Sequence, residues 1–145
     1  MSDNTLEKDL QKRQKRVQDT MREMEMDGCL LGGNINIYYM AGRVFNGYYY
    51  LPAEGEPWCF VKRPNNISGN QIVPIRKPEQ ITDFFQSEGI AFPRRLFLET
   101  DDISYNECTR LQVIFQHPEI GNASTLMRQI RALKTHYEIS QLRLC

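Results

Sequence analysis

The sequence predicts an α/β layer domain with a mixed β-sheet. Helix-like and strand-like segments alternate along the chain, a pattern typical of α/β layer folds. A hairpin pattern near the middle makes part of the sheet antiparallel, so the sheet is expected to be mixed. The length of 145 residues is that of one ordinary domain, long enough to bury a hydrophobic core.

A helix is predicted for residues 4–26. Its apolar residues recur at steps of three, four and seven and share one face: Leu6, Leu10, Val17, Met21 and Met24. The basic cluster at residues 12–16 is interpreted as a solvated helix face, because acidic residues of the same helix are interspersed with it. Asp27-Gly28 is expected to end the helix, since Gly is common just past a helix end.

Strands are predicted next. Cys29–Leu31 is a short apolar run, and residues 35–41 follow with apolar and polar positions in alternation. Tyr48–Leu51 and Trp58–Val61 are strand-prone and flank a turn with two prolines, which predicts a hairpin. Ile72–Ile75 is a further short strand, and Pro74 within it favours an edge position.

The second half of the chain predicts three helices and one strand. The first helix starts near Pro78 and ends at Gly89, with Ile81, Phe84 and Phe85 as its apolar face. Arg95–Glu99 is the strand. Ser104 and Glu107 match a capping box for a helix with a buried face at Tyr105, Cys108, Leu111, Ile114 and Phe115. The last helix follows Asn122, with apolar positions at Leu126, Ile130, Leu133 and Tyr137.

Composition excludes several classes of partner. Lys plus Arg number 18 and Asp plus Glu number 18, so the formal net charge is zero, which argues against nucleic acid or an anionic membrane surface. The apolar runs are far shorter than the ~20 residues of a membrane span. The polar N-terminus lacks a signal peptide, so a cytoplasmic protein is expected. The cysteines form no CxxC pair and are interpreted as reduced thiols: Cys29, Cys59, Cys108 and Cys145.

Few residues suggest catalysis. The two histidines, His117 and His136, match no metal-ligand pattern and are interpreted as surface residues. The carboxylates of Glu99, Asp101 and Asp102 follow a predicted strand and have two interpretations. They could bind a metal or act as acid and base. We favour a solvated loop that leads to the helix at Ser104, whose positive end attracts acidic groups.

A dense aromatic cluster surrounds the loop between Gly42 and Gly47. Most of the cluster is interpreted as core on alternating strand faces, while Phe45, at the tip of the loop, is the strongest candidate for exposure. Neither this loop nor Gly32-Gly33 fits a phosphate-binding glycine motif, so both are interpreted as turns.

Four segments together resemble a known family. They are Met26–Leu31, Asn36–Gly42 (Asn-Ile-Tyr-Tyr-Met-Ala-Gly), Leu98–Ser104 and the helix from Asn122 to Arg143 with Lys134-Thr135 and Glu138-Ile139. In this order the sequence resembles the N-terminal domain of the creatinase/prolidase/Xaa-Pro aminopeptidase family, the pita-bread metallopeptidases. After Gly42 it departs from the commonest pattern of small residues.

The resemblance implies a three-layer α/β/α domain in residues 1–121. It also implies a linker helix in residues 122–145 that leads into a C-terminal catalytic domain, which this chain lacks. The parent enzyme would cleave the bond before proline with two divalent metals, commonly manganese, held in that other domain. The chain alone is then not an enzyme and holds no catalytic or metal-binding residues.

The same resemblance implies a supporting role for the chain. Such a domain assists dimer or tetramer assembly and walls the mouth of the active site that receives the proline-containing peptide. Its loop after the Asn-Ile motif lies over the cleft, so Arg43, Phe45 and Asn46 are expected to face substrate. Removing Arg43 and Phe45 is then expected to leave the melting temperature nearly unchanged.

Three alternatives stay open. The chain could be a free-standing α/β binding or scaffold domain, although its helical pattern is still running at Leu142–Cys145. It could instead be the N-terminal domain of a creatinase-like amidinohydrolase. A third alternative is an independent hydrolase that uses Glu99, Asp101 and Asp102.

Overall fold

A computed structural model describes residues 2–63, 69 and 71–132 of the chain. The described helices are α1 (Ser2–Glu23), α2 (Asn34–Ala41), α3 (Gln80–Glu88), α4 (Tyr105–Ile114) and α5 (Ala123–Ala132). The described strands are β1 (Gly28–Leu31), β2 (Asn46–Pro52), β3 (Trp58–Arg63), β4 (Ile72–Pro74), β5 (Arg95–Leu98) and β6 (Glu119–Asn122).

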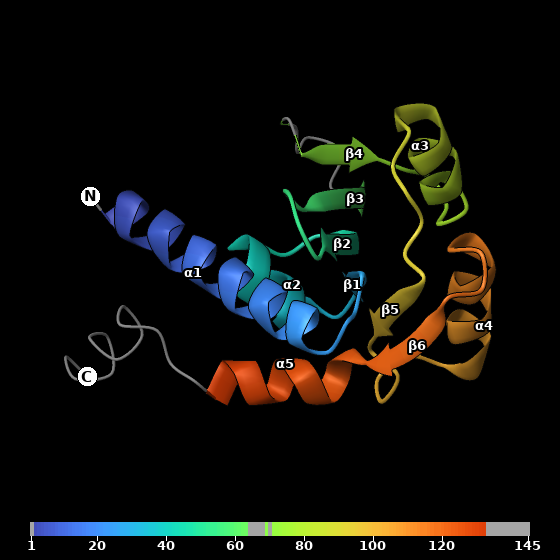
Figure 1. The fold of residues 1–145 in the computed structure, drawn as a ribbon. Helices are drawn as coiled ribbons and strands as arrows, with labels where there is room; N and C mark the ends of the chain where they lie inside the picture. Colours follow the sequence, from blue (N-terminus) through green and yellow to red (C-terminus); the bar gives the residue numbers. More distant parts are fainter. Residues whose placement is uncertain (1, 64–68, 70, 133–145) are drawn as a thin grey trace.

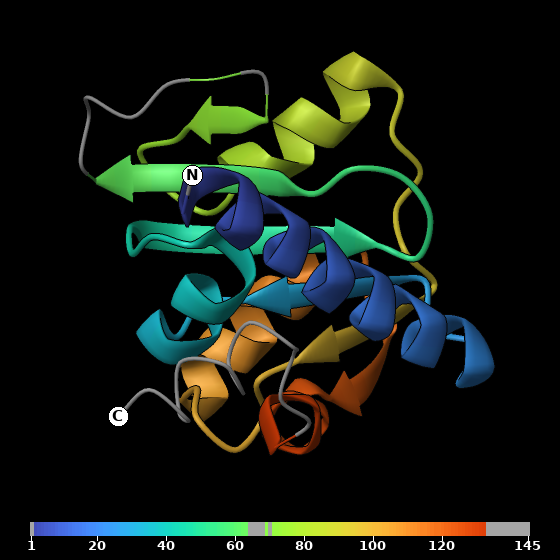
Figure 2. The same cartoon turned by 90° about the vertical axis from the view of Figure 1, so that its left-hand side faces the viewer.

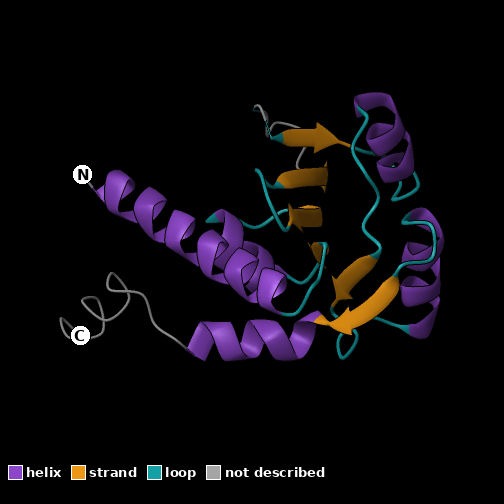
Figure 3. Ribbon diagram, in the orientation of Figure 1, coloured by secondary structure: helices purple, strands orange, loops and turns teal. Residues whose placement is uncertain are grey.

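The strands form one six-stranded sheet in the order β4-β3-β2-β1-β5-β6. Strand β2 runs antiparallel to β1 and β3, and the other neighbouring pairs are parallel. Helices α1, α2 and α5 cover one face and α3 and α4 cover the other, as Figure 1 and the colouring of Figure 3 show. The three-layer α/β/α fold with a mixed sheet is therefore confirmed.

Each face of the sheet buries its own hydrophobic cluster. Because side chains alternate along a strand, Tyr49 of β2 packs under α1 and α2, while Tyr50 packs under α3 and α4. Around Tyr50 the rings of Phe85 and Phe115 lie with centroids 5.2 and 5.8 Å from its own. These aromatic side chains join α3 and α4 to the sheet, and each ring buries a large apolar area.

Helix α1 ends earlier than the sequence suggests. Glu23 is its last residue, Glu25 takes a left-handed conformation (φ 58°), and Gly28 already belongs to β1, so the expected helix end at Asp27-Gly28 was wrong. The helix cannot continue to Asp27, because the backbone of this residue pairs with Arg95 of β5 on one side and with Ala53, just after β2, on the other. Its backbone N–H donates to Arg95, and its carbonyl accepts from Ala53.

The basic cluster on α1 is not wholly a solvated face. Arg13 is buried and pairs with Asp9 at 2.9 Å on the same helix. Its guanidinium donates to the Tyr39 carbonyl at 2.7 Å and lies 4.4 Å from the centre of the Tyr39 ring. A buried arginine needs such partners, and here it fastens α1 to α2.

The strand expected at residues 35–41 is helix α2, so this expectation was wrong. Asn36, Ile37, Tyr39 and Met40 are buried on the helix, whereas Ile35 and Tyr38 face outward. Gly42 ends the helix in a left-handed conformation (φ 77°) that glycine adopts without strain. Its N–H donates to the Tyr38 carbonyl at 2.9 Å.

The hairpin of β2 and β3 is confirmed, and so is the edge position of β4 with Pro74. In this hairpin the backbone of Gly47 in β2 lies very close to the backbone of Phe60 in β3. A Cβ atom there would come within 1.9 Å of the Phe60 carbonyl oxygen, so only glycine fits. Strand β6, at the other edge, has no counterpart among the predicted strands.

Helix α4 begins as predicted, with the Ser104 hydroxyl accepting from the Glu107 N–H at 3.0 Å. Leu111, Ile114 and Phe115 are buried. Tyr105 is 84% exposed, so its predicted burial was wrong. Six residues along a helix turn through about 600°, which places Tyr105 about 120° from Leu111.

Helix α5 packs Leu126, Met127 and Ile130 into the cluster that contains α1. The predicted residues Leu133, His136, Tyr137 and Cys145, with the rest of the linker helix, lie outside the described residues. The division at residues 121 and 122 stays a prediction. None of the described helices has the length and apolarity needed to cross a membrane.

The described cysteines are free thiols, as expected. Cys29 and Cys59 are buried, and burial raises the pKa of both thiols. Cys108 is half-buried. All three therefore serve as small apolar side chains in the protein interior.

Candidate functional site

The loops that follow β1 and β5 lie side by side at one edge of the sheet. These strands are parallel neighbours, with Gly28 opposite Leu96 and Cys29 opposite Phe97. Helix α2 starts at the same edge (Figure 2). Ligands of open α/β sheets commonly bind outside the carboxyl ends of the strands, so the polar residues gathered here are the first candidates for a site.

Glu99, directly after β5, is the centre of this edge. Its side chain is only 3% exposed and accepts backbone N–H groups of Gly32 and Gly33 at 2.7 and 3.0 Å. It also accepts the Asn36 side-chain amide at 2.7 Å. The carboxylate thus lies at the positive end of α2 and satisfies donors there. The expectation of a solvated loop was wrong for Glu99.

The same network reaches α5. Arg131 donates from its guanidinium to the Asn36 side-chain oxygen at 3.0 Å. Asn36 therefore bridges Glu99 after β5 and Arg131 on α5. These three side chains line a pocket of about 360 Å³, and Asn36 links the charged groups of Glu99 and Arg131 there.

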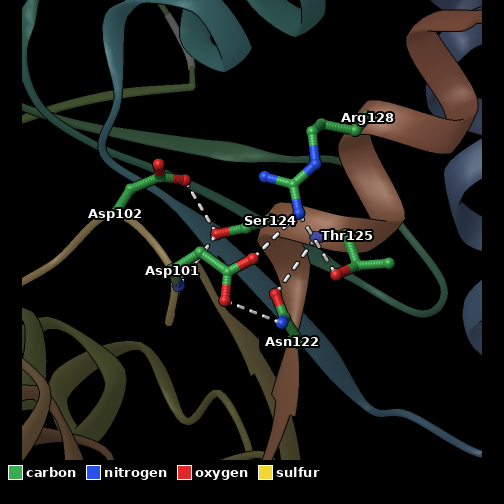
Figure 4. Close-up of polar contacts among 6 residues, drawn as sticks. All are labelled: Asp101, Asp102, Asn122, Ser124, Thr125 and Arg128. Carbon is green, nitrogen blue, oxygen red and sulfur yellow. Dashed lines mark hydrogen bonds and ion pairs between the residues drawn. The ribbon is translucent and has the colours of Figure 1, made fainter.

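Asp101 and Asp102 hold the start of α5 (Figure 4). Asp101 accepts from Arg128 at 2.9 Å and from the Asn122 side chain at 3.1 Å, and these bonds lower the pKa of its carboxyl. The Ser124 hydroxyl donates to Asp102 at 2.7 Å and accepts the Asp101 N–H at 3.2 Å. Both carboxylates are exposed, as expected.

The first turn of α5 is capped in the same place. The Asn122 side-chain oxygen accepts the backbone N–H of Thr125 at 3.1 Å. One surface of polar side chains therefore caps α5 and pins the loop after β5 to it. This arrangement gives the three carboxylates of the loop structural partners.

The described residues do not fit a two-metal centre. No group of three or more His, Cys, Asp and Glu side chains among them could hold a metal ion. His117 is exposed in the turn before β6, where it has a left-handed backbone conformation (φ 57°). Glu99, Asp101 and Asp102 each accept hydrogen bonds from protein groups, which gives them structural roles.

The three side chains predicted to face substrate, those of Arg43, Phe45 and Asn46, lie in different environments. Phe45 is 2% exposed and packs in the core under α1 and α2, so its predicted exposure was wrong. It precedes β2 by one residue and already follows the alternation that buries Tyr49. Arg43 and Asn46 are exposed and line two separate pockets.

Asn46 borders the pocket on the α4 side of this edge, with a volume of about 470 Å³. The Tyr48 hydroxyl donates to Glu107 at 2.9 Å in its wall. Burial, with the Glu107 charge, raises the pKa of Tyr48. Glu107 is thus engaged with Tyr48 in β2. Arg110, also in the wall, makes two hydrogen bonds of 2.6 Å to Glu79.

The structure exposes apolar side chains beside this edge that were not predicted from the sequence. Ile35 is 70% exposed and Tyr38 is 59% exposed, and residues three apart on a helix are surface neighbours. Val44, just after α2, is 48% exposed. We call these three residues the α2 surface. Their spacing would have revealed it only if residues 35–41 had been interpreted as a helix.

Comparisons with known proteins give a consistent result. The sequence profile of the creatinase/prolidase N-terminal domain family matches residues 13–133. No sequence among the curated proteins matches the chain. Several solved structures share its fold.

One of them is a proline dipeptidase from Streptococcus pneumoniae TIGR4, with 16% identity and a TM-score of 0.69. The match covers 83% of this chain and 98% of that one. Another is the N-terminal domain of cytoplasmic peptidase PepQ from Mycobacterium tuberculosis H37Rv, with 16% identity and a TM-score of 0.66, covering 81% and 97%.

A third is the Xaa-Pro dipeptidase from Bacillus anthracis, with 18% identity and a TM-score of 0.70. The match covers 90% of this chain and 38% of that chain. The present chain thus spans little more than a third of this longer relative. At these identities the likeness shows a shared fold.

Proposed function

The chain belongs to the creatinase/prolidase N-terminal domain family, and we propose that it is the non-catalytic N-terminal domain of a proline-specific metallopeptidase. The parent enzyme would be an Xaa-Pro dipeptidase or aminopeptidase. Two divalent metals, with manganese as the expected ion, would be held by a C-terminal domain. The family match over residues 13–133 is the observation that carries this proposal.

The long Bacillus anthracis dipeptidase supports a parent enzyme with a non-catalytic N-terminal domain and a separate catalytic domain. A domain of the present fold accounts for about a third of that chain, which leaves room for a separate catalytic domain. In the present chain the carboxylates of Glu99 and Asp101 are engaged in holding α2 and α5. We also propose the cytoplasm as the compartment of the parent, by analogy with the cytoplasmic peptidase PepQ.

We propose that the α2 surface packs against the catalytic domain or against a second subunit of a homo-oligomer. Ile35 and Tyr38 expose apolar area that a partner would remove from water. Glu99 and Asn36 hold this helix firmly in place, which favours a rigid contact. Asn46 at the same edge of the sheet is the side chain that we place nearest to the substrate.

An assay of Xaa-Pro hydrolysis tests the assignment. The 145-residue chain, loaded with manganese, is incubated with a proline-containing dipeptide and tripeptide, and no turnover above an enzyme-free control is expected. The longest natural gene product that contains this sequence is expected to cleave at least one of them. Turnover that co-purifies with the 145-residue chain would overturn the non-catalytic role.

Surface variants of that longer product test the α2 surface. Changing Ile35 and Tyr38 together to Ser is expected to weaken subunit association in sedimentation or to raise KM. The melting temperature of the isolated 145-residue chain should hardly change. Tyr105→Ser, on exposed α4, is the matched control and should leave association and kinetics unchanged. If the double variant behaves like this control, the α2 surface has no partner.

A further inference from the structure

The pocket that Arg43 lines lies on the face of the sheet covered by α1 and α2. Helix α1 lies near the sheet at its C-terminal end and moves away from it toward Ser2 (Figure 1), while it crosses in front of the strands (Figure 2). Under its N-terminal half, a pocket of about 320 Å³ opens between α1, α2 and the strands β2, β3 and β4. We call it the α1–β3 pocket.

Its walls are mostly apolar and come from five elements. They are Leu10 of α1, Met40 of α2, Tyr49 of β2, Cys59 of β3 and Ile72 of β4. Burial raises the pKa of the Cys59 thiol to about 11, so this wall is uncharged at neutral pH. Such a surface accepts the hydrocarbon part of a ligand.

Arg43 supplies a cation at the pocket. Its side chain is exposed, and its positive charge pulls the pKa of the Cys59 thiol down against the effect of burial. The guanidinium therefore lies within electrostatic reach of the pocket wall. Arg43 is the one charged residue in the described lining, so the pocket suits a single carboxylate.

Gln71 supplies an acceptor in the same pocket. Its side-chain oxygen is buried and has no hydrogen-bond partner among the described residues. A buried acceptor without a donor costs free energy that a ligand N–H group would recover. Gln71 directly precedes β4, and its carbonyl accepts the Cys59 N–H at 2.8 Å.

We propose that the α1–β3 pocket binds a free α-amino acid with an apolar side chain. Its carboxylate would pair with Arg43, its ammonium group would donate to Gln71, and its side chain would lie against Met40 and Ile72. Arginine pairs well with carboxylates through two parallel hydrogen bonds. Ligand sites start at about 300 Å³, which indicates a small ligand. The site does not depend on the peptidase assignment.

Titration of the full ¹⁵N-labelled chain with L-leucine tests this site by NMR. Saturable shifts are expected at the backbone amides of Met40, Cys59 and Ile72. L-leucinamide lacks the carboxylate and 4-methylpentanoate lacks the ammonium group. Each is expected to bind about tenfold more weakly, because each loses the charge-assisted hydrogen bonding to one of the two polar side chains. Equal binding of all three compounds would overturn the proposed recognition.

Variants assign the two polar partners. Arg43→Met should lower affinity for L-leucine about tenfold and leave that for L-leucinamide unchanged. Gln71→Met should lower the affinity for L-leucine and leave the affinity for 4-methylpentanoate unchanged. Arg76→Met, an exposed arginine outside the pocket, is the matched control and should bind L-leucine normally.

Thermal melts without ligand show whether each variant is folded before it is titrated. A ligand that binds only the folded chain also raises its melting temperature, which gives a second readout. No saturable shift in the folded wild-type chain, or shifts confined to other residues, would overturn the site. So would an Arg43→Met variant that binds L-leucine as tightly as the wild type does.

Discussion

The side-chain amide of Asn36 donates a 2.7 Å hydrogen bond to the carboxylate of Glu99, 63 residues further along the chain. The same carboxylate accepts the N–H groups of Gly32 and Gly33. Gly33, which precedes α2, offers no side-chain cap of its own. Glu99 therefore holds the start of α2 through the two residues before the helix and through the Asn36 side chain in its first turn, and the α2 surface depends on it.

Glu99→Ala should lower the free energy of unfolding by about 3 kcal/mol. It removes the acceptor of three donors at a buried helix end, and each unsatisfied buried donor costs about 1–3 kcal/mol before water compensates. Denaturant melts measure the loss. Glu88→Ala, at the exposed end of α3, is the control and should change stability by less than about 0.5 kcal/mol. Similar losses in both variants would contradict the role of Glu99 in holding the start of α2.

Phe45→Ala should cost about 3–5 kcal/mol, the usual range for emptying a buried aromatic site. Its side chain is 2% exposed, whereas the neighbouring Arg43 is exposed. Arg43→Ala should therefore stay within about 0.5 kcal/mol. Urea melts of the two variants measure both losses. The sequence alone predicted that neither change would lower stability. A Phe45→Ala variant as stable as the wild type would show that the Phe45 side chain is not buried in the core.

Leu111→Ala tests the phase of α4. Leu111 is 2% exposed between this helix and the sheet, so the change should cost about 2–5 kcal/mol. Val113, two residues on, is 58% exposed, and Val113→Ala should cost less than about 0.5 kcal/mol. Equal losses, measured by chemical denaturation, would mean that the helix is rotated.

The Glu79–Arg110 pair predicts a pH dependence. Hydrogen bonds from Arg110 lower the pKa of Glu79 from 4.5 to about 2. A lowered pKa means that the pair stabilises the fold above about pH 4.5 and loses this effect as the pH falls toward 2. The pair is half exposed, so solvent screens it and its contribution to stability is small.

Stability curves of the wild type and of Glu79→Gln measure this effect. Their difference should be constant from pH 7 to 5 and vanish between about pH 4.5 and 2. Glu54→Gln, in the exposed hairpin turn, is the control and should run parallel to the wild type throughout. A Glu79→Gln difference that persists at pH 2 would show that the charge of Glu79 is not responsible.

The local sequence was sufficient where an element carries its own signals. Helix α4 begins at the Ser104 cap, and α3 ends at Gly89 in the left-handed conformation that glycine favours. The β2–β3 hairpin surrounds a proline-containing turn. The order of these elements led to the α/β class, because each signal acts within a few residues and needs no distant partner.

Elements without local signals depended on distant contacts. Residues 35–41 alternate like a strand, yet they form α2, and Glu99 holds its start through the N–H groups of the two preceding glycines. Strand β6 is four residues long and is defined by its pairing with β5. Neither partner could be found from spacing along the chain, so the candidate site around Asn36 was not predicted.

The sequence by itself determined the α/β class, the start of α4, the end of α3 and the hairpin of this protein. The tertiary structure alone decided that Phe45 is core, that Arg13 is buried against Tyr39, and that Arg43 and Asn46 line separate pockets. The physical reason is the same for the two buried residues, Phe45 and Arg13. A buried polar group is stable only with a partner, and an apolar side chain only with neighbours. Here both come from elements far away in the sequence.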